Sequence, residues 1–377
     1  MLFPGVYKEE IFPAPPPELI TGVAAFLGFA EKGPVNEPQR LTLWPQFVET
    51  FGGRVLGGYL YHAVEGFFSN GGNLCYVVRL EGEKVLLKEA LLKALKELES
   101  IDAVDLICAP DILSGRVTKE QVQEMQKALL EHCDRMGERF AILDAPSFPA
   151  GSRLADILQH RQALQSDSGA LYFPWIAIES GGYIPPCGHV AGIYAKCDRD
   201  VGVHRPPANY LMEGVLDVQI DLSEVEFATL NPESEVAKIN CLRALKGRGI
   251  RIWGARTLSS DPTWSYVNVR RLFLTVGRWC DRNLADVAFE PNDYKLWVRI
   301  ERELITYLQS LFEAGALKGN SPQEGFYVKC DSETNPPEIR DAGTVVTEIG
   351  LAPAIPNEFI VVRLIHGNAG VTLSQPI

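Results

Sequence analysis

The first half of the chain alternates between two spacings of hydrophobic residues. Short apolar runs typical of buried strands occupy residues 23–30, 74–80, 104–109, 140–144 and 172–179. Amphipathic spacing between them predicts helices at 44–51, 59–69, 84–99, 118–136, 152–165 and 186–196. Strands that alternate with helices favour a mostly parallel sheet covered by helices on both faces. We therefore expect an α/β domain over residues 21–210.

The pattern changes after residue 210. Strands are predicted at 216–222, 250–255, 326–329 and 344–349, and helices at 266–282 and 294–312. Helices here no longer alternate one by one with strands, which is typical of the α+β class. Residues 211–350 are therefore expected to form a second, α+β domain.

The N-terminal segment joins a strand pattern to a run of prolines. Residues 3–11 have the alternation of a strand, and the proline-rich residues 12–18 favour polyproline II and form a stiff spacer. A strand on such a spacer is poorly placed to join its own sheet and well placed to join the sheet of another chain. We define residues 1–20 as the N-terminal arm.

The C-terminal end has the same design. An apolar strand is predicted at 359–365, behind a segment, 351–357, that holds Pro353 and Pro356. We define residues 351–377 as the C-terminal arm, and we expect both arms to leave the body of the subunit.

Composition and charge exclude several classes of protein. The chain has 377 residues, of which 46% are hydrophobic, and a formal net charge of −12. An acidic chain argues against general nucleic-acid binding and against docking to an anionic membrane by charge. No apolar run reaches the roughly 18 residues of a membrane-spanning helix. The N-terminus lacks the basic and apolar regions of a secretory signal, so we expect synthesis in the cytoplasm.

Two carboxylates follow strands of the predicted parallel sheet, where α/β proteins place their ligands. Asp111 follows the strand at 104–109, and Asp144 ends the strand at 140–144. A Mg²⁺ site or an acid–base pair would use such residues. Aspartates are also common at turns and helix starts, and we favour this structural interpretation.

Cysteine and histidine gather in one segment. Cys187, His189, Cys197 and His204 lie close together in sequence, as a Cys–His nucleophile or a metal site would require. Cys187 and His189 are two residues apart, however, so on a helix they point to different faces. The eight cysteines contain no CxxC pair and are expected to be reduced core thiols. We favour a structural role here and expect no metal and no cofactor.

Basic residues form two further features. The turn at residues 246–249, Lys-Gly-Arg-Gly, would suit a phosphate contact or a β-hairpin, and the hairpin is favoured. On the two late helices the basic positions are Arg270, Arg271, Arg278 and Arg282, then Lys295, Arg299 and Arg302. Residues 295, 299 and 302 share one helix face. Such a face is either merely solvated or a dock for an acidic partner.

Several segments carry a resemblance to a known family. They are PGVYKEEI (4–11), TGVAAFLGFAEKGPVNEP (21–38), GGNLCYVVRL (71–80), GHVAGIYAKCDRDVGVHRPPAN (188–209), GRGIRIWGARTLSSDPTWSYVNVRRL (247–272), FEPNDYKLWVRI (289–300), EGFYVKCDSETN (324–335) and EIGLAPAIPNEFIVVRL (348–364). In these segments the chain resembles the contractile tail sheath proteins of phage tails, R-type bacteriocins and extracellular injection systems. The segments follow the family order over nearly the whole chain.

The resemblance implies a structural protein with no catalytic activity. It implies a central fold often described as subtilisin-like, here without a catalytic Asp/His/Ser arrangement. The subunits would stack as rings into a helical sheath around an inner tube protein, store energy in an extended metastable state, and contract. Baseplate and terminator proteins would be further partners, within a phage-tail-like particle.

The resemblance also implies roles for particular residues. Strands donated to neighbouring subunits would be centred on Val6, Tyr7 and Ile11 in one arm and on Phe359, Val361, Val362 and Leu364 in the other. A helix of the C-terminal domain would grip the tube, with Lys295, Arg299 and Arg302 as first candidates and Arg270, Arg271 and Arg278 as second. Residues 366–377 extend beyond the usual family end, and their role is open.

Two other functions compete with the sheath. A static shell or surface lattice would share self-assembly but would have one geometry instead of two. A hydrolase-like α/β enzyme would need Asp111 and Asp144 to converge in a pocket.

Overall fold

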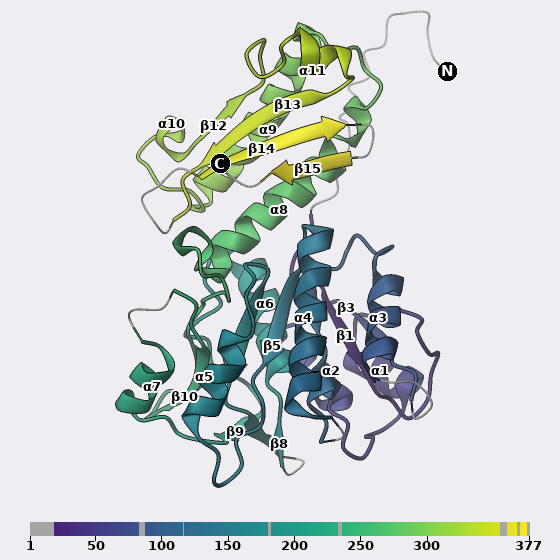
Figure 1. Cartoon of the computed structure of the whole chain (residues 1–377), viewed down its shortest axis with the longest axis vertical. Helices are drawn as coiled ribbons and strands as arrows, with labels where there is room; N and C mark the ends of the chain where they lie inside the picture. Colours follow the sequence, from purple (N-terminus) through teal and green to yellow (C-terminus); the bar gives the residue numbers. More distant parts are fainter. Residues whose placement is uncertain are drawn as a thin grey trace, which may run out of the picture.

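The chain forms two domains joined by a long helix (Figure 1). The computed structural model describes residues 19–82, 87–115, 117–179, 182–232, 236–354, 360–367 and 370–374, the last two as main chain only. The larger domain is built on an eight-stranded sheet and the smaller on a four-stranded sheet. Helix α8 (Val267–Asn283) lies between the two sheets (Figure 1).

The large sheet is mostly parallel, as the alternating pattern predicts. Its strand order is β11-β10-β6-β5-β4-β1-β3-β2, and only the edge strands β2 and β11 run antiparallel to their neighbours. The strands are β1 Ala24–Gly28, β2 Gln39–Leu41, β3 Cys75–Arg79, β4 Leu106–Cys108, β5 Phe140–Asp144, β6 Gly169–Phe173, β10 Asn240–Leu245 and β11 Gly249–Trp253. A small sheet of β7 (Ile176–Ile178), β8 (Tyr183–Ile184) and β9 (Val215–Val218) lies beside it.

Helices cover both faces of the large sheet because successive strand residues point to opposite sides. One core contains Phe26 together with residues of α1, α2 and α6, and the other contains Leu27 together with residues of α3, α4 and α5. The helices of this domain are α1 Trp44–Phe51, α2 Leu60–Ser69, α3 Leu87–Leu98, α4 Lys119–Met136, α5 Leu154–Gln162, α6 Cys187–Asp200 and α7 Glu224–Leu230. The expected α/β class is therefore confirmed.

Two predictions about this domain need correction. The strand expected at 172–179 is divided between β6 and β7, which belong to different sheets, with Pro174 between them. Strands β10 and β11 belong to the large sheet, because β10 pairs with β6. The domain boundary predicted at residue 210 therefore falls inside the α/β domain, which continues through β11.

The C-terminal domain is α+β, as expected. Its sheet has the order β12-β13-β14-β15 and is antiparallel throughout. The strands are β12 Phe326–Lys329, β13 Val345–Leu351, β14 Ile360–Gly367 and β15 Gly370–Ser374, and the helices are α9 Tyr294–Glu313, α10 Pro322–Gly325 and α11 Pro337–Asp341. Its hydrophobic core lies between the sheet and helices α8 and α9.

Helices α2 and α6 cross unusually closely, and glycine is the reason. A Cβ on Gly188 would lie 2.1 Å from the carbonyl oxygen of Ala63, and one on Gly192 would lie 2.4 Å from that of Phe67. Neither contact is sterically tolerable. The glycines of the segment beginning at residue 188 are therefore packing residues of the α/β core.

Candidate functional site

The carboxyl edge of the parallel sheet is where an α/β enzyme would place its site. Asp111 lies in a 3-10 turn after β4 and is completely buried. Its carboxylate accepts hydrogen bonds from the backbone N–H groups of Phe29, at 2.5 Å, and Tyr59. Asp111 thus ties the end of β1 to the start of α2, in agreement with its structural interpretation.

Asp144 is buried at the end of β5, against the start of α6. Burial raises the pKa of its carboxyl group to about 7, and hydrogen bonds from the backbone and thiol of Cys187 oppose that rise. The two predicted aspartates therefore hold separate main-chain segments and do not form one acid–base pair.

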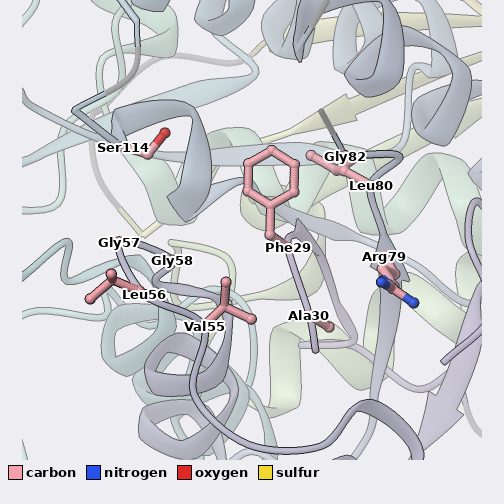
Figure 2. Close-up of a pocket in the computed structure, with 10 residues that line it drawn as sticks. All are labelled: Phe29, Ala30, Val55, Leu56, Gly57, Gly58, Arg79, Leu80, Gly82 and Ser114. Atoms are coloured by element: carbon pink, nitrogen blue, oxygen red, sulfur yellow. The ribbon is translucent and has the colours of Figure 1, made fainter. Parts of the chain in front are cut away.

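A cavity of about 240 Å³ does open at this edge (Figure 2). Its walls are mainly apolar, including Phe29, Val55 and Leu80, and neither predicted aspartate lines it. Ser114 contributes a buried hydroxyl, and the guanidinium of Arg79 donates to the carbonyl of Gly33 at 2.8 Å. These residues supply no nucleophile–base pair.

Three of the four cysteine and histidine residues of the predicted segment are part of the core, whereas His204 follows α6 and is half-buried. Cys187, His189 and Cys197 are buried on α6. Burial lowers the pKa of His189 to about 4, so its imidazole is neutral. Within the described ranges, no three His, Cys, Asp or Glu side chains have a geometry that could hold a metal ion.

The arginines of α8 form a buried ionic cluster between the two domains, which we call the interdomain clasp. Arg271 donates to both carboxylate oxygens of Asp198, at 2.8 and 2.6 Å, and to Asp105 at 3.0 Å. Arg278 lies 3.8 Å from both Asp105 and Glu138. The clasp fastens α8 to the α/β domain at the amino ends of its parallel strands.

The clasp also holds the point where the chain enters from the N-terminal arm. The carboxylate of Asp105 accepts hydrogen bonds from the backbone N–H groups of Gly22, at 3.0 Å, and Val23, at 2.6 Å. A Cβ on Gly22 would lie 2.6 Å from the Cα of Ala195, so only glycine fits there. The sequence gives no local signal for this role of Asp105, because its partners are far away along the chain.

This burial corrects one expectation. Arg271 and Arg278 are 3% and 4% exposed, and both are engaged in the clasp. Arg270 lies 3.2 Å from Asp167 and stacks over the ring of Trp264. Packing and pairing of these guanidiniums inside the chain contradict the expectation that they present charge to a tube.

Helix α9 presents a different surface. Lys295 and Arg302 are exposed, and in the described part of the chain neither forms an ion pair. Arg299 instead contacts three carboxylates of its own domain, those of Asp286, Glu290 and Glu303, at 2.5 to 3.0 Å. The predicted cationic face is therefore reduced to Lys295 and Arg302.

Three apolar side chains that the sequence analysis missed lie on the same exposed side of α9. Tyr294, Val298 and Ile305 are 72%, 41% and 39% exposed. Their spacing places them in one stripe beside Lys295 and Arg302. The signal was present in the sequence, because these apolar positions fall outside the stripe of buried α9 residues. We call these five residues the α9 face.

The predicted C-terminal arm strand appears as β14. It pairs antiparallel with β13 of the same chain from Leu351↔Ile360 to Val345↔His366, which corrects the expectation that this arm leaves the body of its own subunit. Leu351, assigned to the arm, is the last residue of β13. β15 pairs in turn with β14, so the tail whose role was open adds an edge strand. Val361, Val362 and Leu364 lie on β14, whereas Val6, Tyr7, Ile11 and Phe359 lie outside the described residues.

No helix in the described part of the chain is long and apolar enough to cross a membrane.

Comparison with known sequences gives two consecutive family matches. The phage tail sheath protein central domain matches residues 87–258, and the phage tail sheath C-terminal domain matches residues 259–365. The tail sheath protein of Salmonella phage ViI is 24% identical over 218 residues, which cover 54% of this chain and 32% of that protein. A putative prophage major tail sheath protein of Pseudomonas aeruginosa is 27% identical over 152 residues, or 38% of each chain.

Solved structures match over nearly the whole chain. A chain of the anti-feeding prophage baseplate has a TM-score of 0.76 and 27% identity, and the match covers 96% of this chain and 98% of that one. A chain of the PVC sheath complex, from an extracellular contractile injection system in the contracted state, has a TM-score of 0.74 and 28% identity over 96% of both chains. The chain spans less than two fifths of the length of the curated relatives, but nearly all of these solved chains.

Proposed function

Because the chain belongs to the phage tail sheath family, we propose that it is the repeating subunit of a contractile sheath that surrounds an inner tube. Copies polymerise helically as stacked rings, store free energy in an extended state, and contract to drive the tube through a target envelope. Baseplate and terminator proteins bind the ends of the cylinder. The assembled particle, not the free chain, is the functional form.

One observation carries this proposal. β14 lies behind a proline-bearing tether and pairs through its main chain with β13 and β15. Such pairing fixes register without demanding particular side chains. The same β14 can therefore leave its own β13 and pair with the β13 of a neighbouring copy, as in domain swapping. Exchange of this kind, together with the N-terminal arm, links subunits while their bodies rotate.

Contraction places a further demand on the subunit. The extended state must persist until it is triggered, so a kinetic barrier has to hold it above the contracted state. The proline-bearing segment at 12–18 and the part of the C-terminal tether beyond Ala354 absorb the change in direction between bodies and arms. Residues 351–354 stay with the body, because Ala352 and Ala354 form backbone hydrogen bonds with Gly325 and Ala316. A static lattice would need neither hinge nor a second geometry, and an enzyme would need polar groups that converge, which Asp111 and Asp144 do not.

We propose that the α9 face contacts the tube. It combines an apolar stripe with two exposed cations, Lys295 and Arg302, and such mixtures are typical of interfaces that must form and release. Arg299 is left out of this contact, because its three carboxylate partners already neutralise it.

The assembly test is electron microscopy of the purified chain, with and without a tube protein. Replacing residues 3–11 by a Gly–Ser segment of equal length keeps the chain length and removes the donated strand. The wild type is expected to form hollow ridged cylinders, and the variant to stay monomeric with an unchanged far-UV spectrum. Ordered cylinders from the variant would refute exchange of the N-terminal strand.

The tube contact has a test of its own. The test variant carries Lys295→Glu and Arg302→Glu. The control carries Lys96→Glu and Lys127→Glu, at two exposed positions on α3 and α4, and changes the net charge by the same amount. Only the first pair is expected to prevent co-assembly with the tube. Equal behaviour of the two double variants would exclude the α9 face as the contact.

A further inference from the structure

One aromatic side chain stands out on the surface. Phe289, in the loop after α8, is fully exposed, and its backbone is left-handed, with φ at 72°. A bulky residue rarely adopts this conformation, and strain of this kind tends to persist where it serves a function. The loop therefore holds a phenyl ring out in water at a cost in both solvation and backbone energy.

The surroundings of Phe289 are acidic. Asp286 and Glu290 lie on either side of it in the sequence, and they share Arg299 with Glu303. Three carboxylates thus face a single guanidinium, and negative charge remains in excess. We call Phe289 with its two acidic neighbours the acidic knob.

The opposite surface character occurs in a cavity of the α/β domain. The cavity has a volume of about 400 Å³, and its apolar lining includes Phe227, Ile252 and the half-exposed Trp253. Lys238, whose ammonium group donates to the carbonyl of Pro232, and Arg256 also line it, and none of the described lining residues is a carboxylate. We call this cavity the cationic pocket; its size is within the range of pockets that enclose ligand-sized groups.

The neighbouring hairpin adds to the positive charge. Arg243 and Arg251 lie directly opposite each other on β10 and β11, and in the described part of the chain neither forms an ion pair. Like charges directly opposite in a sheet are unfavourable. The basic turn at 246–249 joins these two strands, as the hairpin interpretation predicted. An unbalanced cationic hairpin in a chain of net charge −12 is suited to an acidic partner.

Knob and pocket lie at opposite ends of helix α8. The pocket residue Ala255 accepts a hydrogen bond at 3.0 Å from the backbone N–H of Val267, the first residue of the helix. The knob follows the last helical residue, Asn283. Seventeen helical residues separate the ends by roughly 25 Å. Therefore the knob cannot fill the pocket of its own chain.

We propose that the acidic knob of one copy enters the cationic pocket of the next copy. A patch and a distant pocket that are complementary make a heterologous contact, which continues from copy to copy and generates filaments. Burial of the ring and pairing of the excess carboxylate charge with Arg256 and with the hairpin residues Arg243 and Arg251 act together. This inference rests on the proposed assembly and assigns it a body-to-body contact in addition to the exchanged arms.

Cross-linking of the full-length chain tests the contact. All eight native cysteines are buried, so introduced thiols react selectively. Phe289→Cys with Trp253→Cys places one thiol in each half of the contact, and mild oxidation of assembled cylinders is expected to give a ladder of covalent multimers. The control, Phe289→Cys with Leu56→Cys, uses a fully exposed residue elsewhere in the α/β domain and is expected to give no ladder.

The outcomes separate this inference from the proposed function. If cylinders form without the ladder of multimers, the knob contact is overturned and the proposed sheath function stands. The same conclusion follows if the control pair gives a ladder as strong as that of the test pair. Absence of wild-type cylinders, even with tube protein, overturns the proposed function itself.

A photoreactive phenylalanine analogue at position 289 gives a second test, because it retains the aromatic ring. Attachment to peptides from residues 227–256 of another copy supports the contact, and attachment elsewhere refutes it. Phe289→Ala should raise the critical concentration for assembly at least tenfold.

Discussion

Replacement of Arg271 by methionine tests whether the interdomain clasp holds the subunit together. The substitution keeps a long apolar side chain and removes the guanidinium that contacts Asp198 and Asp105. The two carboxylate side chains are only 1% and 6% exposed, so water cannot replace the lost partner. The variant is therefore left with buried, uncompensated negative charge.

The size of the effect follows from that burial. Removing one partner of a buried ion pair typically costs about 3–5 kcal/mol. The unfolding entropy of a chain of 377 residues is about 0.8 kcal/mol per kelvin, so a loss of about 4 kcal/mol lowers Tm by about 5 °C. Burial already raises the pKa of Asp198, and without Arg271 it rises further. Protonation of Asp198 should therefore reduce the deficit at acidic pH.

The assay is thermal unfolding of the unassembled chain, followed by tryptophan fluorescence at pH 7.5 and pH 5. The control is Arg282→Met, the same substitution on the same helix at an exposed position. The control should change Tm by less than about 1 °C, since exposed substitutions usually cost within 0.5 kcal/mol. A Tm for Arg271→Met as high as that of the control would refute the prediction that the clasp stabilises the folded chain.

Two further predictions concern pH. Burial lowers the pKa of His132, His160 and His189 to about 4, below their ordinary value of 6.5, so the folded chain binds fewer protons than the unfolded chain between these values. Stability should fall as pH drops from 6.5 towards 4, by up to roughly 3 kcal/mol for each histidine; a urea midpoint that stays constant over this range would contradict the prediction. Asp144 acts in the opposite direction, because its raised pKa favours the folded state at low pH and removes that stability as pH rises from 4 to 7. Asp144→Asn should therefore raise the urea midpoint at pH 8, because it removes a cost of up to about 4 kcal/mol in unfolding free energy. An unchanged midpoint would show that the ionised Asp144 does not destabilise the fold.

The sequence predicted those elements whose pattern is local. The helix at 118–136 is an example: Thr118 and Gln121 form the capping box at its start, with hydrogen bonds of 3.3 and 2.9 Å. Strand β10 was missed because its polar residues hide the strand pattern. Asn240 is buried there, and its side chain bonds the backbone of Leu171 and Arg256, partners that come from distant parts of the chain.

The same limit applies to the charged residues. Basic residues on a helix look alike in sequence, whether they face solvent or a buried carboxylate. Arg271 finds Asp198 and Asp105 only because α8 packs against the amino ends of the parallel strands. Lys295 and Arg302 remain exposed because α9 turns its other side to the core. Tertiary packing therefore decides which of the predicted cations can meet a partner.

The clasp also bears on how a sheath built from this chain can change shape. One carboxylate, that of Asp105, binds the arginines of α8 and the backbone where the N-terminal arm leaves the α/β domain. Motion between the two domains would have to separate these desolvated charges, which costs more than rotation about a proline-bearing tether. The two domains should therefore move as one body during contraction. Force carried by the N-terminal arm then reaches helix α8 directly. The acidic knob and the cationic pocket lie at the two ends of this helix.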